Sequence, residues 1–362
     1  MERGLVRLVD ELGERHELPL ADYETLVARW TPELAAYAAE RAAGVRRSVY
    51  GDEVFVRGLI EIGNHCKNDC LYCGIRRSNV TATRYRLSAD DIHACVEKGY
   101  ELGFRTFVLQ GGEDAWLDDE RLCSVVGAIK GAHPDCAVTL SVGERSRESY
   151  QALFDAGADR YLLRHETADP AHYALLHPAD MSFEGRMCCL ADLREIGYAV
   201  GCGFMVGSPY QTPAHLARDL KFIEGFRPEM CGIGPFVPHH ATPFAHEPAG
   251  SVGLTCFLLS LLRLMHPGLL LPATTALGTL EADGRERGIL AGANVVMPNL
   301  SPTSVRGKYE LYDNKAVEGS ESAEGLALLS ERMRSIGYRV VVDRGDPRMV
   351  PAPCDAPATS SV

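Results

Sequence analysis

The stretch I-E-I-G-N-H-C-K-N-D-C-L-Y-C-G-I-R-R-S-N, residues 60–79, places Cys66, Cys70 and Cys73 in a C-x3-C-x2-C array. The residues just before the cysteines, V-F-V-R-G-L-I-E-I at 54–62, are rich in β-branched and aromatic side chains and are followed by a glycine and an asparagine. Such a run predicts a strand that ends in a turn. We therefore expect the three thiols just past the C-terminal end of a strand.

Three cysteines on one loop indicate a metal centre that is short of one ligand. Iron–sulfur clusters and zinc both bind thiolates, and both normally take four protein ligands. A closed zinc site usually offers a second C-x2-C or a histidine pair, and neither follows here. His65 adjoins Cys66 and would be a strained fourth ligand. The spacing favours an iron–sulfur cluster, with one iron that has no protein ligand, over zinc. A redox or disulfide role ranks third, because a disulfide would use two of the three thiols and leave the third unpaired.

Composition limits the classes of partner. The formal charge of −12 over 362 residues argues against a general nucleic-acid or membrane-surface binder. Arg76, Arg77, Arg84 and Arg86 form a local basic cluster, which we interpret as a solvated face or an anion contact rather than an RNA site. The longest apolar stretch, Cys256–Ala273, is interrupted by charged residues and proline, so it is too short to span a membrane. We expect no nucleic-acid or membrane partner.

Twelve cysteines without an N-terminal signal peptide suit a reducing cytosol better than a disulfide framework. We therefore expect a cytoplasmic protein. Nine cysteines lie outside the array without a second metal-ligand spacing, and we interpret most of them as small core residues.

From Val54 onward, strand-like runs alternate with amphipathic helical segments, which is typical of β-α units around a parallel sheet. The expected strands are 54–62, 106–110, 137–142, 160–165, 200–206, 230–234, 269–272 and 294–297. The expected helices between them are 89–102, 120–132, 147–156, 184–196, 214–224, 254–265 and 282–291. Eight units predict an α/β fold, a closed (β/α)8 barrel of the TIM type, in which chemistry collects at the C-terminal ends of the strands. The alternative is an open six-unit barrel with the last two units as an appendage.

The remaining segments divide the chain into three expected parts. Residues 1–50 form an N-terminal helical extension, with helices at 5–12 and 23–46, the second capped by Asp22. Residues 51–345 form the barrel, with one more helix at about 321–336 and a short strand at 339–343. The tail, 346–362, is rich in Pro, Ala, Ser and Thr and is expected to be disordered. Helix C-caps are expected at five glycines, Gly99, Gly103, Gly157, Gly197 and Gly337.

Two strand ends carry groups that suit a charged ligand. Gly111 and Gly112 allow the backbone to approach a ligand closely and are followed by Glu113. A glycine turn that binds no ligand would have the same sequence. The fourth strand reads D-R-Y-L-L-R-H-E-T at 159–167, which puts Arg160, Arg164 and Glu166 on one face if the strand is regular. Buried, these charges must either pair with one another or bind a carboxylate and a ribose.

Two later segments offer weaker candidates. Thr274 and Thr275 lie in a strand-to-helix loop, where helix capping would account for one of them. His239 and His240 lie in a proline-rich loop, 235–248, without a partner at ligand spacing. We interpret the two histidines as loop residues rather than metal ligands.

The array, with an aromatic residue at Tyr72 just before its last cysteine, resembles the radical S-adenosylmethionine (SAM) superfamily. The resemblance implies that the three cysteines hold a 4Fe-4S cluster whose fourth iron is chelated by SAM. One-electron reduction would then cleave SAM to methionine and a 5′-deoxyadenosyl radical.

Within that superfamily the chain resembles the HydE branch, maturases of FeFe-hydrogenase. The matching stretches include Y-E-L-G-F-R-T-F-V-L-Q-G-G-E-D at 100–114, G-A-D-R-Y-L-L-R-H-E-T-A at 157–168 and G-A-N-V-V-M-P-N-L-S-P at 292–302. The stretch L-P-A-T-T-A-L-G-T-L at 271–280 favours the maturases over the related methylornithine synthases. The resemblance covers most of residues 50–345.

Carried over position by position, the resemblance implies two sets of residues beyond the cluster cysteines. Those around SAM are Tyr72 near the adenine, Gly111, Gly112 and Glu113 at the methionine part, and Glu166 and Arg186. Those lining the substrate cavity are Arg160, Arg164, Thr139, Thr274, Thr275, Tyr309 and Tyr312. The implied substrate is an iron–cysteine complex bearing CO and cyanide, delivered by a partner maturase, whose cysteine sulfur the adenosyl radical attacks. Other hydrogenase maturases and an electron donor are the implied transient partners.

The chain departs from the HydE pattern at several positions. Gly63 and Gly111 stand where serine is usual, which leaves substrate recognition open. Val317, Gly325 and Leu328 stand where some members carry cysteines for a second cluster, so we predict one cluster only. Two other functions remain from the sequence: a radical SAM amino-acid mutase such as methylornithine synthase, which acts on lysine, and a non-catalytic metal-binding scaffold.

Overall fold

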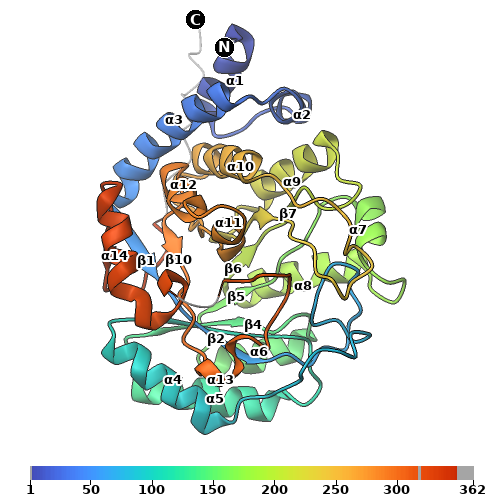
Figure 1. Ribbon diagram of the computed structural model, residues 1–362, viewed down its shortest axis with the longest axis vertical. Coiled ribbons are helices and arrows are strands. Elements are labelled where there is room, and N and C mark those ends of the chain that lie inside the picture. The colour runs from blue at the N-terminus through green and yellow to red at the C-terminus, as the bar shows by residue number, and fades with distance from the viewer. Residues whose placement is uncertain (1, 317–318, 349–362) are drawn as a thin grey trace, which may run out of the picture.

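The computed structural model describes residues 2–316 and 319–348. Short parallel strands form a ring at its centre, and helices surround the ring (Figure 1). One sheet contains, in order, β2 (Gly58–Gly63), β3 (Thr106–Gly111), β4 (Ala137–Ser141), β5 (Arg160–Leu162), β6 (Ala199–Cys202) and β8 (Met230–Cys231). A second sheet places β1 (Glu53–Val56) between β10 (Val295–Val296) and β11 (Arg339–Val341).

Single bridges at the seventh strand position close the ring. Met230 pairs with Leu270, and Pro272 pairs with Val295. Hydrogen bonds join this position to both neighbours: Cys231 N donates to Leu270 O at 3.0 Å, and Ala273 N donates to Val295 O at 2.9 Å. Since β1 and β2 are separated only by Arg57, the first strand then joins β10 to β3. The eight-unit barrel is confirmed, and the open six-unit alternative is wrong.

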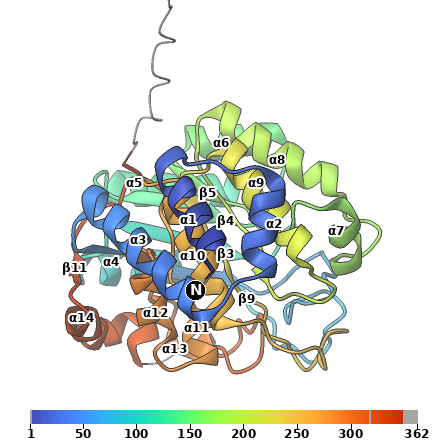
Figure 2. The same ribbon diagram turned by 90° about the horizontal axis from the view of Figure 1, so that it is seen from above.

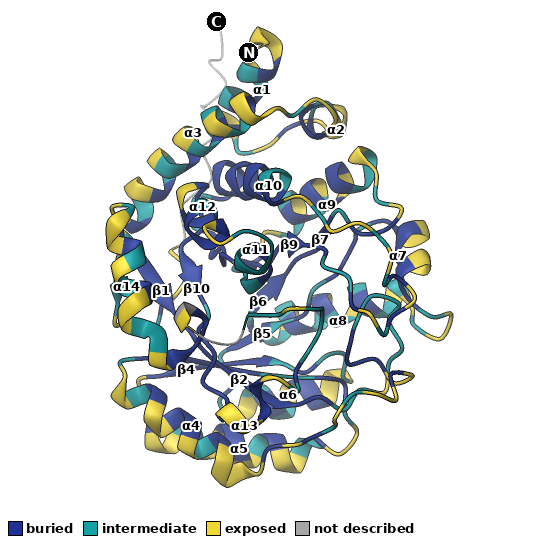
Figure 3. Cartoon of the chain, in the orientation of Figure 1, coloured by how far each residue is buried: buried dark blue, intermediate teal, exposed yellow. Residues whose placement is uncertain are grey.

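The helices predicted between the strands are present and lie outside the ring. They are α4 (Ala89–Glu101), α5 (Asp119–Ala132), α6 (Arg147–Asp155), α8 (Phe183–Ile196), α9 (Pro213–Phe226), α10 (Val252–Met265) and α12 (Gly284–Leu290). Most begin at a serine or aspartate whose side chain accepts a hydrogen bond from the third helical N–H, as Ser88 does from Asp91. Their outer faces are exposed and their inner faces buried, as Figure 3 shows for α4 and α5.

The N-terminal residues form three helices instead of two: α1 (Arg3–Arg15), α2 (Leu20–Ala28) and α3 (Pro32–Tyr50). The predicted helix at 23–46 is divided because Thr31 caps α3, its side chain accepting from Leu34 N at 3.2 Å, and Pro32 follows at the first helical position. Asp22 therefore lies in the first turn of α2 rather than at a cap. The three helices cover α9 and α10, which leaves α10 buried along most of its length (Figure 2).

Several predicted boundaries differ from the structure. The strand expected at 160–165 ends at Leu162, and the strand expected at 200–206 divides into β6 and β7 (Met205–Val206), which pairs with β9 (Gly234–Pro235). The short helices α7 (Pro170–Leu176) and α11 (Thr275–Leu280) were not expected. Gly99 lies inside α4 against Leu300, whereas the other four predicted cap glycines take positive φ.

After β10 the chain passes through α13 (Thr303–Arg306), two 3₁₀ turns (Gly319–Glu321 and Ala323–Gly325) and α14 (Leu326–Ser335) before β11. The segment that follows β11 lies at the N-terminal ends of the strands. Thr106 Oγ1 then donates to Arg344 O at 2.6 Å, and Arg348 N donates to Tyr50 Oη at 3.0 Å. The disorder predicted for 346–362 is therefore wrong for residues 346–348, and the rest of that segment lies outside the described residues. Within the described ranges, no helix is long and apolar enough to cross a membrane.

Candidate active site

The cysteine array lies where the sequence predicts, on the loop that follows β2. Cys66, Cys70 and Cys73 are partly buried thiols. Burial, and then the charge of the neighbouring thiols, raises the pKa of Cys73 to about 12, and the pKa of Cys70 also lies well above its usual value. Three thiolates could not share this loop without a cation to neutralise them. The donor set therefore fits a bound metal cluster.

Arg84 holds the loop in shape. Its guanidinium donates to four backbone carbonyls, those of residues 64, 75, 76 and 79, at 2.6 to 3.0 Å. Asp69 fixes the middle of the loop, since its carboxylate accepts from Arg76 Nε at 2.7 Å and from the backbone N–H of Ser78 at 2.9 Å. The hydrogen bond from Arg76 keeps the pKa of Asp69 well below its usual range. Two members of the predicted basic cluster thus order the cysteine loop.

The glycine pair after β3 packs directly against the cysteine loop. A Cβ at Gly112 would lie 2.3 Å from the carbonyl oxygen of His65 and 2.8 Å from Cys66 Cβ, so only glycine fits there. Glu113 completes the contact: its carbonyl accepts from Lys67 N at 2.8 Å, and its carboxylate accepts from Glu144 N at 2.9 Å. The structure thus joins the turn to the cysteines, as the sequence suggested.

The two glycines that replace serine face each other. Gly63 and Gly111 are partners in the β2–β3 register. A Cβ at Gly111 would lie 3.3 Å from Ile62 Cγ1, and one at Gly63 would lie 3.2 Å from Tyr85 O. Both contacts are tight, so a serine at either position requires its neighbours to move by a few tenths of an ångström.

At the end of β5, the regular strand that the sequence suggested gives way to a turn. Glu166 takes φ 66°, and its N–H donates to Gly203 O at 3.0 Å. Arg164 Nη2 lies 3.2 Å from Glu166 Oε2, but the two atoms do not form a hydrogen bond. Arg186, from α8, donates to Arg164 O at 2.7 Å and pairs with Glu144. These side chains lie together at the mouth of the barrel.

Arg160 lies at the opposite end of the strand. Its guanidinium donates to Asp346 Oδ1 at 2.6 Å and to Arg344 O at 3.0 Å, at the base of the barrel. The expectation that Arg160, Arg164 and Glu166 share one face of a regular strand is therefore wrong, because β5 ends at Leu162 and the backbone turns at Glu166. Arg160 instead borders a small void of about 10 Å³ with Thr139 and Arg57. Arg57 was not predicted, although an arginine within an apolar strand signals a buried charge.

Four of the remaining predicted residues, Thr274, Thr275, Tyr309 and Tyr312, lie after the seventh and eighth strand positions, and the fifth, Tyr72, lies on the cysteine loop. Thr274 is the N-cap residue of α11, yet its hydroxyl makes no capping bond, and Thr275 begins the helix. Tyr309 Oη accepts from Gln110 Nε2 at 3.3 Å. Tyr72 Oη, beside the cysteines, lies 3.1 Å from His177 Nε2. Burial raises the pKa of both Tyr309 and Tyr312, so both are neutral phenols.

A buried ion pair that the sequence reasoning missed lies beside Tyr309. Glu61, on β2, is fully buried and pairs with Lys315, whose ammonium also donates to Tyr309 O at 3.0 Å. Asn299 Nδ2 donates to the same carboxylate at 2.9 Å. The only signal in the sequence is a glutamate inside the apolar run G-L-I-E-I. The pair joins the segment that carries the two tyrosines to the first strand.

His239 and His240 lie near Asp313, which follows them by more than 70 residues. His240 Nδ1 lies 2.7 Å from Asp313 Oδ1. Nδ1 of His239 accepts from Ala241 N at 3.1 Å, which leaves the proton of the neutral ring on Nε2. That tautomer is unsuited to metal binding through Nε2. Asp313 nevertheless supplies the partner that the sequence did not reveal, since ligand atoms of His239, His240 and Asp313 lie within 4.8 Å of one another. The interpretation of both histidines as loop residues stays a prediction.

Buried polar atoms without hydrogen-bond partners run through the inside of the barrel. Among the described residues they include Arg57 Nε and Nη2, Thr139 Oγ1, Arg164 Nε and Nη2, Glu166 Oε2 and Thr274 Oγ1. Each such atom costs about 1–3 kcal/mol if it stays unpaired. They fit ligands that present both anionic groups and hydroxyl or amino groups, as SAM and an amino-acid-bearing substrate do.

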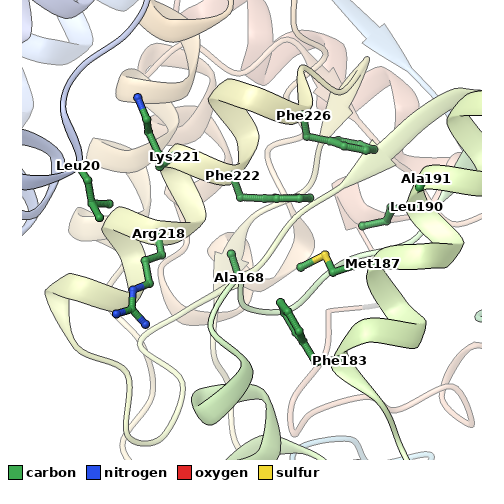
Figure 4. Close-up of a pocket in the computed structure, with 10 residues that line it drawn as sticks. All are labelled: Leu20, Ala168, Phe183, Met187, Leu190, Ala191, Arg218, Lys221, Phe222 and Phe226. Carbon is green, nitrogen blue, oxygen red and sulfur yellow. The ribbon is translucent and has the colours of Figure 1, made fainter.

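An apolar groove of about 490 Å³ lies elsewhere, on the outer surface between α8 and α9. Figure 4 shows Phe183 and Met187 from α8 opposite Phe222 from α9. The cations at its rim, Arg218 and Lys221, are already paired with Asp169 and Glu224. None of the cysteines lines the groove, so we do not place the chemistry there.

Comparison with known proteins agrees with this geometry. The sequence model of the Radical SAM superfamily matches residues 60–223. The [FeFe] hydrogenase maturase subunit HydE of Thermotoga maritima is 46% identical over 271 residues, which are 75% of this chain and 77% of that one. The chain belongs to the radical SAM superfamily, in its HydE branch. It is a radical SAM enzyme with a role in hydrogenase maturation, and the family implies a 4Fe-4S cluster and SAM.

Three further comparisons give lower sequence identity. The 3-methylornithine synthase of Methanosarcina barkeri is 28% identical over 313 residues, covering 86% of this chain and 88% of that one. The crystal structure of methylornithine synthase (PylB) aligns with a TM-score of 0.80 at 26% identity, covering 92% of this chain and 97% of that one. The structure of HydG, a maturase of the [FeFe]-hydrogenase, aligns at 0.77 with 18% identity, covering 93% and 76%, and shows the fold alone.

Proposed function

We propose that the chain is a HydE-type maturase that acts on an iron–cysteine complex bearing CO and cyanide in the assembly of the hydrogenase active site. The observation that carries the proposal is the set of buried cationic, anionic and hydroxyl atoms without hydrogen bonds inside the barrel of a chain that is 46% identical over 271 residues to the HydE of Thermotoga maritima. In this proposal the radical attacks the sulfur of the substrate's cysteine.

Cys66, Cys70 and Cys73 would hold one cluster. With the cluster and SAM bound, one-electron reduction supplies a 5′-deoxyadenosyl radical. The carboxylate of Glu166, whose Oε2 accepts no hydrogen bond in the structure, would accept hydrogen bonds from the hydroxyls of the SAM ribose. Arg186 orients this turn through its bond to Arg164 O. The backbone of 111–113 bounds the methionine part, and Tyr72 bounds the adenine.

Arg164 is the group best placed to bind the carboxylate of the substrate's cysteine. Its Nε and Nη2 are buried and make no hydrogen bond, although Nη2 forms an ion pair with Glu166 Oε2, and together the two nitrogens form one edge of the guanidinium fork. Thr274 Oγ1 and Thr139 Oγ1 offer further hydrogen bonds inside the barrel. Thr275, Tyr309 and Tyr312 complete the wall near the mouth, and Arg57 and Arg160 lie at the base, where Arg160 is paired with Asp346.

The second candidate function is a radical SAM amino-acid mutase. The alignment with methylornithine synthase at a TM-score of 0.80 favours it, and Arg164 would bind an α-amino acid equally well. Anaerobic incubation of the reconstituted protein with SAM and a reductant tests the choice. We expect 5′-deoxyadenosine release to rise with the iron–cysteine complex and not with lysine. Formation of methylornithine from lysine would overturn the maturase proposal.

A further inference from the structure

Glu166, at the mouth of the barrel, has a backbone conformation that is unfavourable for a residue with a side chain. Its φ of 66° lies in the left-handed region, and such a conformation persists only where surrounding contacts hold it. The residues on either side of it, His165 and Thr167, are fully buried, with exposed fractions of 0%. The contacts that hold the turn of residues 164–168 should therefore lie on its buried side.

The His165 ring connects this turn to the end of β6. Its Nδ1 accepts from the backbone N–H of Gly203 at 3.3 Å, and the carbonyl of Gly203 accepts from Glu166 N at 3.0 Å. A Cβ at Gly203 would lie 2.1 Å from Gly232 O, so only glycine permits this approach. Because Nδ1 is the acceptor, the proton of the neutral ring lies on Nε2, which faces α9.

Asp219, on α9, contacts the turn from behind. Its side chain is fully buried, and its Oδ1 accepts from Ala168 N at 2.5 Å and lies 3.3 Å from His165 Nε2. Phe222, on the same helix, packs its ring against the His165 ring, with the centroids 4.7 Å apart. A buried carboxylate is unfavourable unless donors surround it, and this one meets the turn at both His165 and Ala168.

We infer that His165 and Asp219 are positioning residues, which hold residues 164–168 in the conformation that presents Glu166 and Arg164 at the mouth of the barrel. The inference rests on the proposed function, in which Glu166 binds the ribose of SAM. The two side chains face α9, so they act through the turn rather than on the ligand. Without them the left-handed backbone at Glu166 relaxes, and its carboxylate loses the fixed place in which it meets the ribose hydroxyls.

Asp219→Ala removes this anchor, and Asp219→Asn is its conservative counterpart. Asparagine keeps an oxygen for Ala168 N and places its NH2 group where Oδ2 makes no hydrogen bond in the structure. The first readout is hydrogen–deuterium exchange in the full chain, reconstituted without oxygen and kept free of SAM. Exchange at the N–H groups of Glu166 and Ala168 should be about tenfold faster in Asp219→Ala and close to the wild-type rate in Asp219→Asn.

The second readout is the dissociation constant of SAM, measured by equilibrium dialysis without a reductant, so that no turnover takes place. We expect it to rise about tenfold in Asp219→Ala, the scale of losing one charge-assisted hydrogen bond, and to stay within about threefold of the wild type in Asp219→Asn. Should Asp219→Ala not fold, His165→Asn gives the same comparison. Its oxygen can accept from Gly203 N, but its amide is too short to reach Asp219.

The matched control is His266→Ala, which removes another buried histidine that contacts α9, since His266 Nε2 lies 3.0 Å from Ile223 O. It should lower the unfolding temperature and leave SAM affinity and exchange at Glu166 unchanged. Unchanged exchange or an unchanged dissociation constant in Asp219→Ala overturns the inference. An equal loss of SAM affinity in His266→Ala or Asp219→Asn also overturns it, because a general loss of stability would then be the cause. Wild-type protein that does not bind SAM would refute the proposed function, and the exchange rates would still decide whether the pair holds the turn.

Discussion

Arg160 and Arg164 lie four residues apart, yet the chain gives their guanidinium groups different partners. Arg160 is held by Asp346 and Arg344 at the base of the barrel. Arg164 forms an ion pair with Glu166 at the mouth, yet its Nε and Nη2 are buried and make no hydrogen bond. Since buried donors are stabilised by hydrogen bonds, Arg164 is the arginine of the two that retains donors for a ligand.

Arg164→Lys therefore tests substrate binding. Lysine keeps the charge and loses the fork, so we expect substrate-dependent turnover to fall about tenfold or more, the equivalent of about 1.5–3 kcal/mol for a charge-assisted contact. Release of 5′-deoxyadenosine without the iron–cysteine substrate should persist, because the cluster ligands are on another loop. Both rates are measured against Arg147→Lys, a conservative change on the exposed face of α6. Full turnover in Arg164→Lys, or loss of both activities, would refute the assignment.

At the scale of elements, the segment after β11 is joined to the base of the barrel by ion pairs. Asp346 pairs with Arg160, Arg344 pairs with Asp159 at 3.3 Å, and Arg348 pairs with Glu53 at 2.7 Å. These contacts join β1, β5 and the C-terminal segment, three parts of the chain that are distant in sequence. Ion pairs thus stabilise the base in addition to the apolar cluster of Tyr50, Phe55, Met230, Leu270 and Val295.

Asp346→Asn should remove the ion pairs that Asp346 forms with Arg160 and Arg344. Asp346 is half-exposed, so we expect a loss of about 1 kcal/mol in the free energy of unfolding, the scale of a screened ion pair. Although burial opposes it, pairing with Arg160 and Arg344 lowers the pKa of Asp346. A lowered pKa means that the stabilisation is present above pH 3.8 and is lost as the pH falls further. The urea concentration at the unfolding midpoint should be lower for the variant than for the wild type at neutral pH, and this difference should be smaller at pH 3. Equal midpoints at neutral pH would contradict the role.

The elements also show what a sequence pattern can and cannot predict. Long amphipathic helices such as α4 and α5 were found because capping residues and apolar periodicity agree. The β5 strand was overextended, because its alternation does not reveal that the backbone turns to positive φ at Glu166. Cysteine spacing and the glycine pair identified the cofactor end of the site. Arg57 and the Glu61–Lys315 pair were missed, because a charged residue within an apolar strand does not indicate which distant residue contacts it.

At the scale of the whole molecule, the cysteines outside the array are dispersed through the fold. Cys95, Cys136 and Cys256 are buried in the core on separate elements, and Cys202 faces Cys231 on adjacent strands. Of the positions where some HydE proteins carry further cysteines, Gly325 ends a 3₁₀ turn and Leu328 is exposed on α14, whereas Val317 lies outside the described residues. Among the described residues, the array is thus the single place where three cysteines gather on one loop.

Iron content is the prediction that follows for the molecule. Anaerobic reconstitution should give about four irons per chain, as one cubane requires. Alanine at Cys66, Cys70 or Cys73 should abolish iron binding, because two thiolates do not hold such a cluster, whereas Cys188→Ala, at an exposed position of α8, should retain it. About eight irons would mean a second cluster, contrary to the prediction of one. Stoichiometric zinc in protein isolated without oxygen, with no uptake of iron, would show that the three thiols serve a different metal.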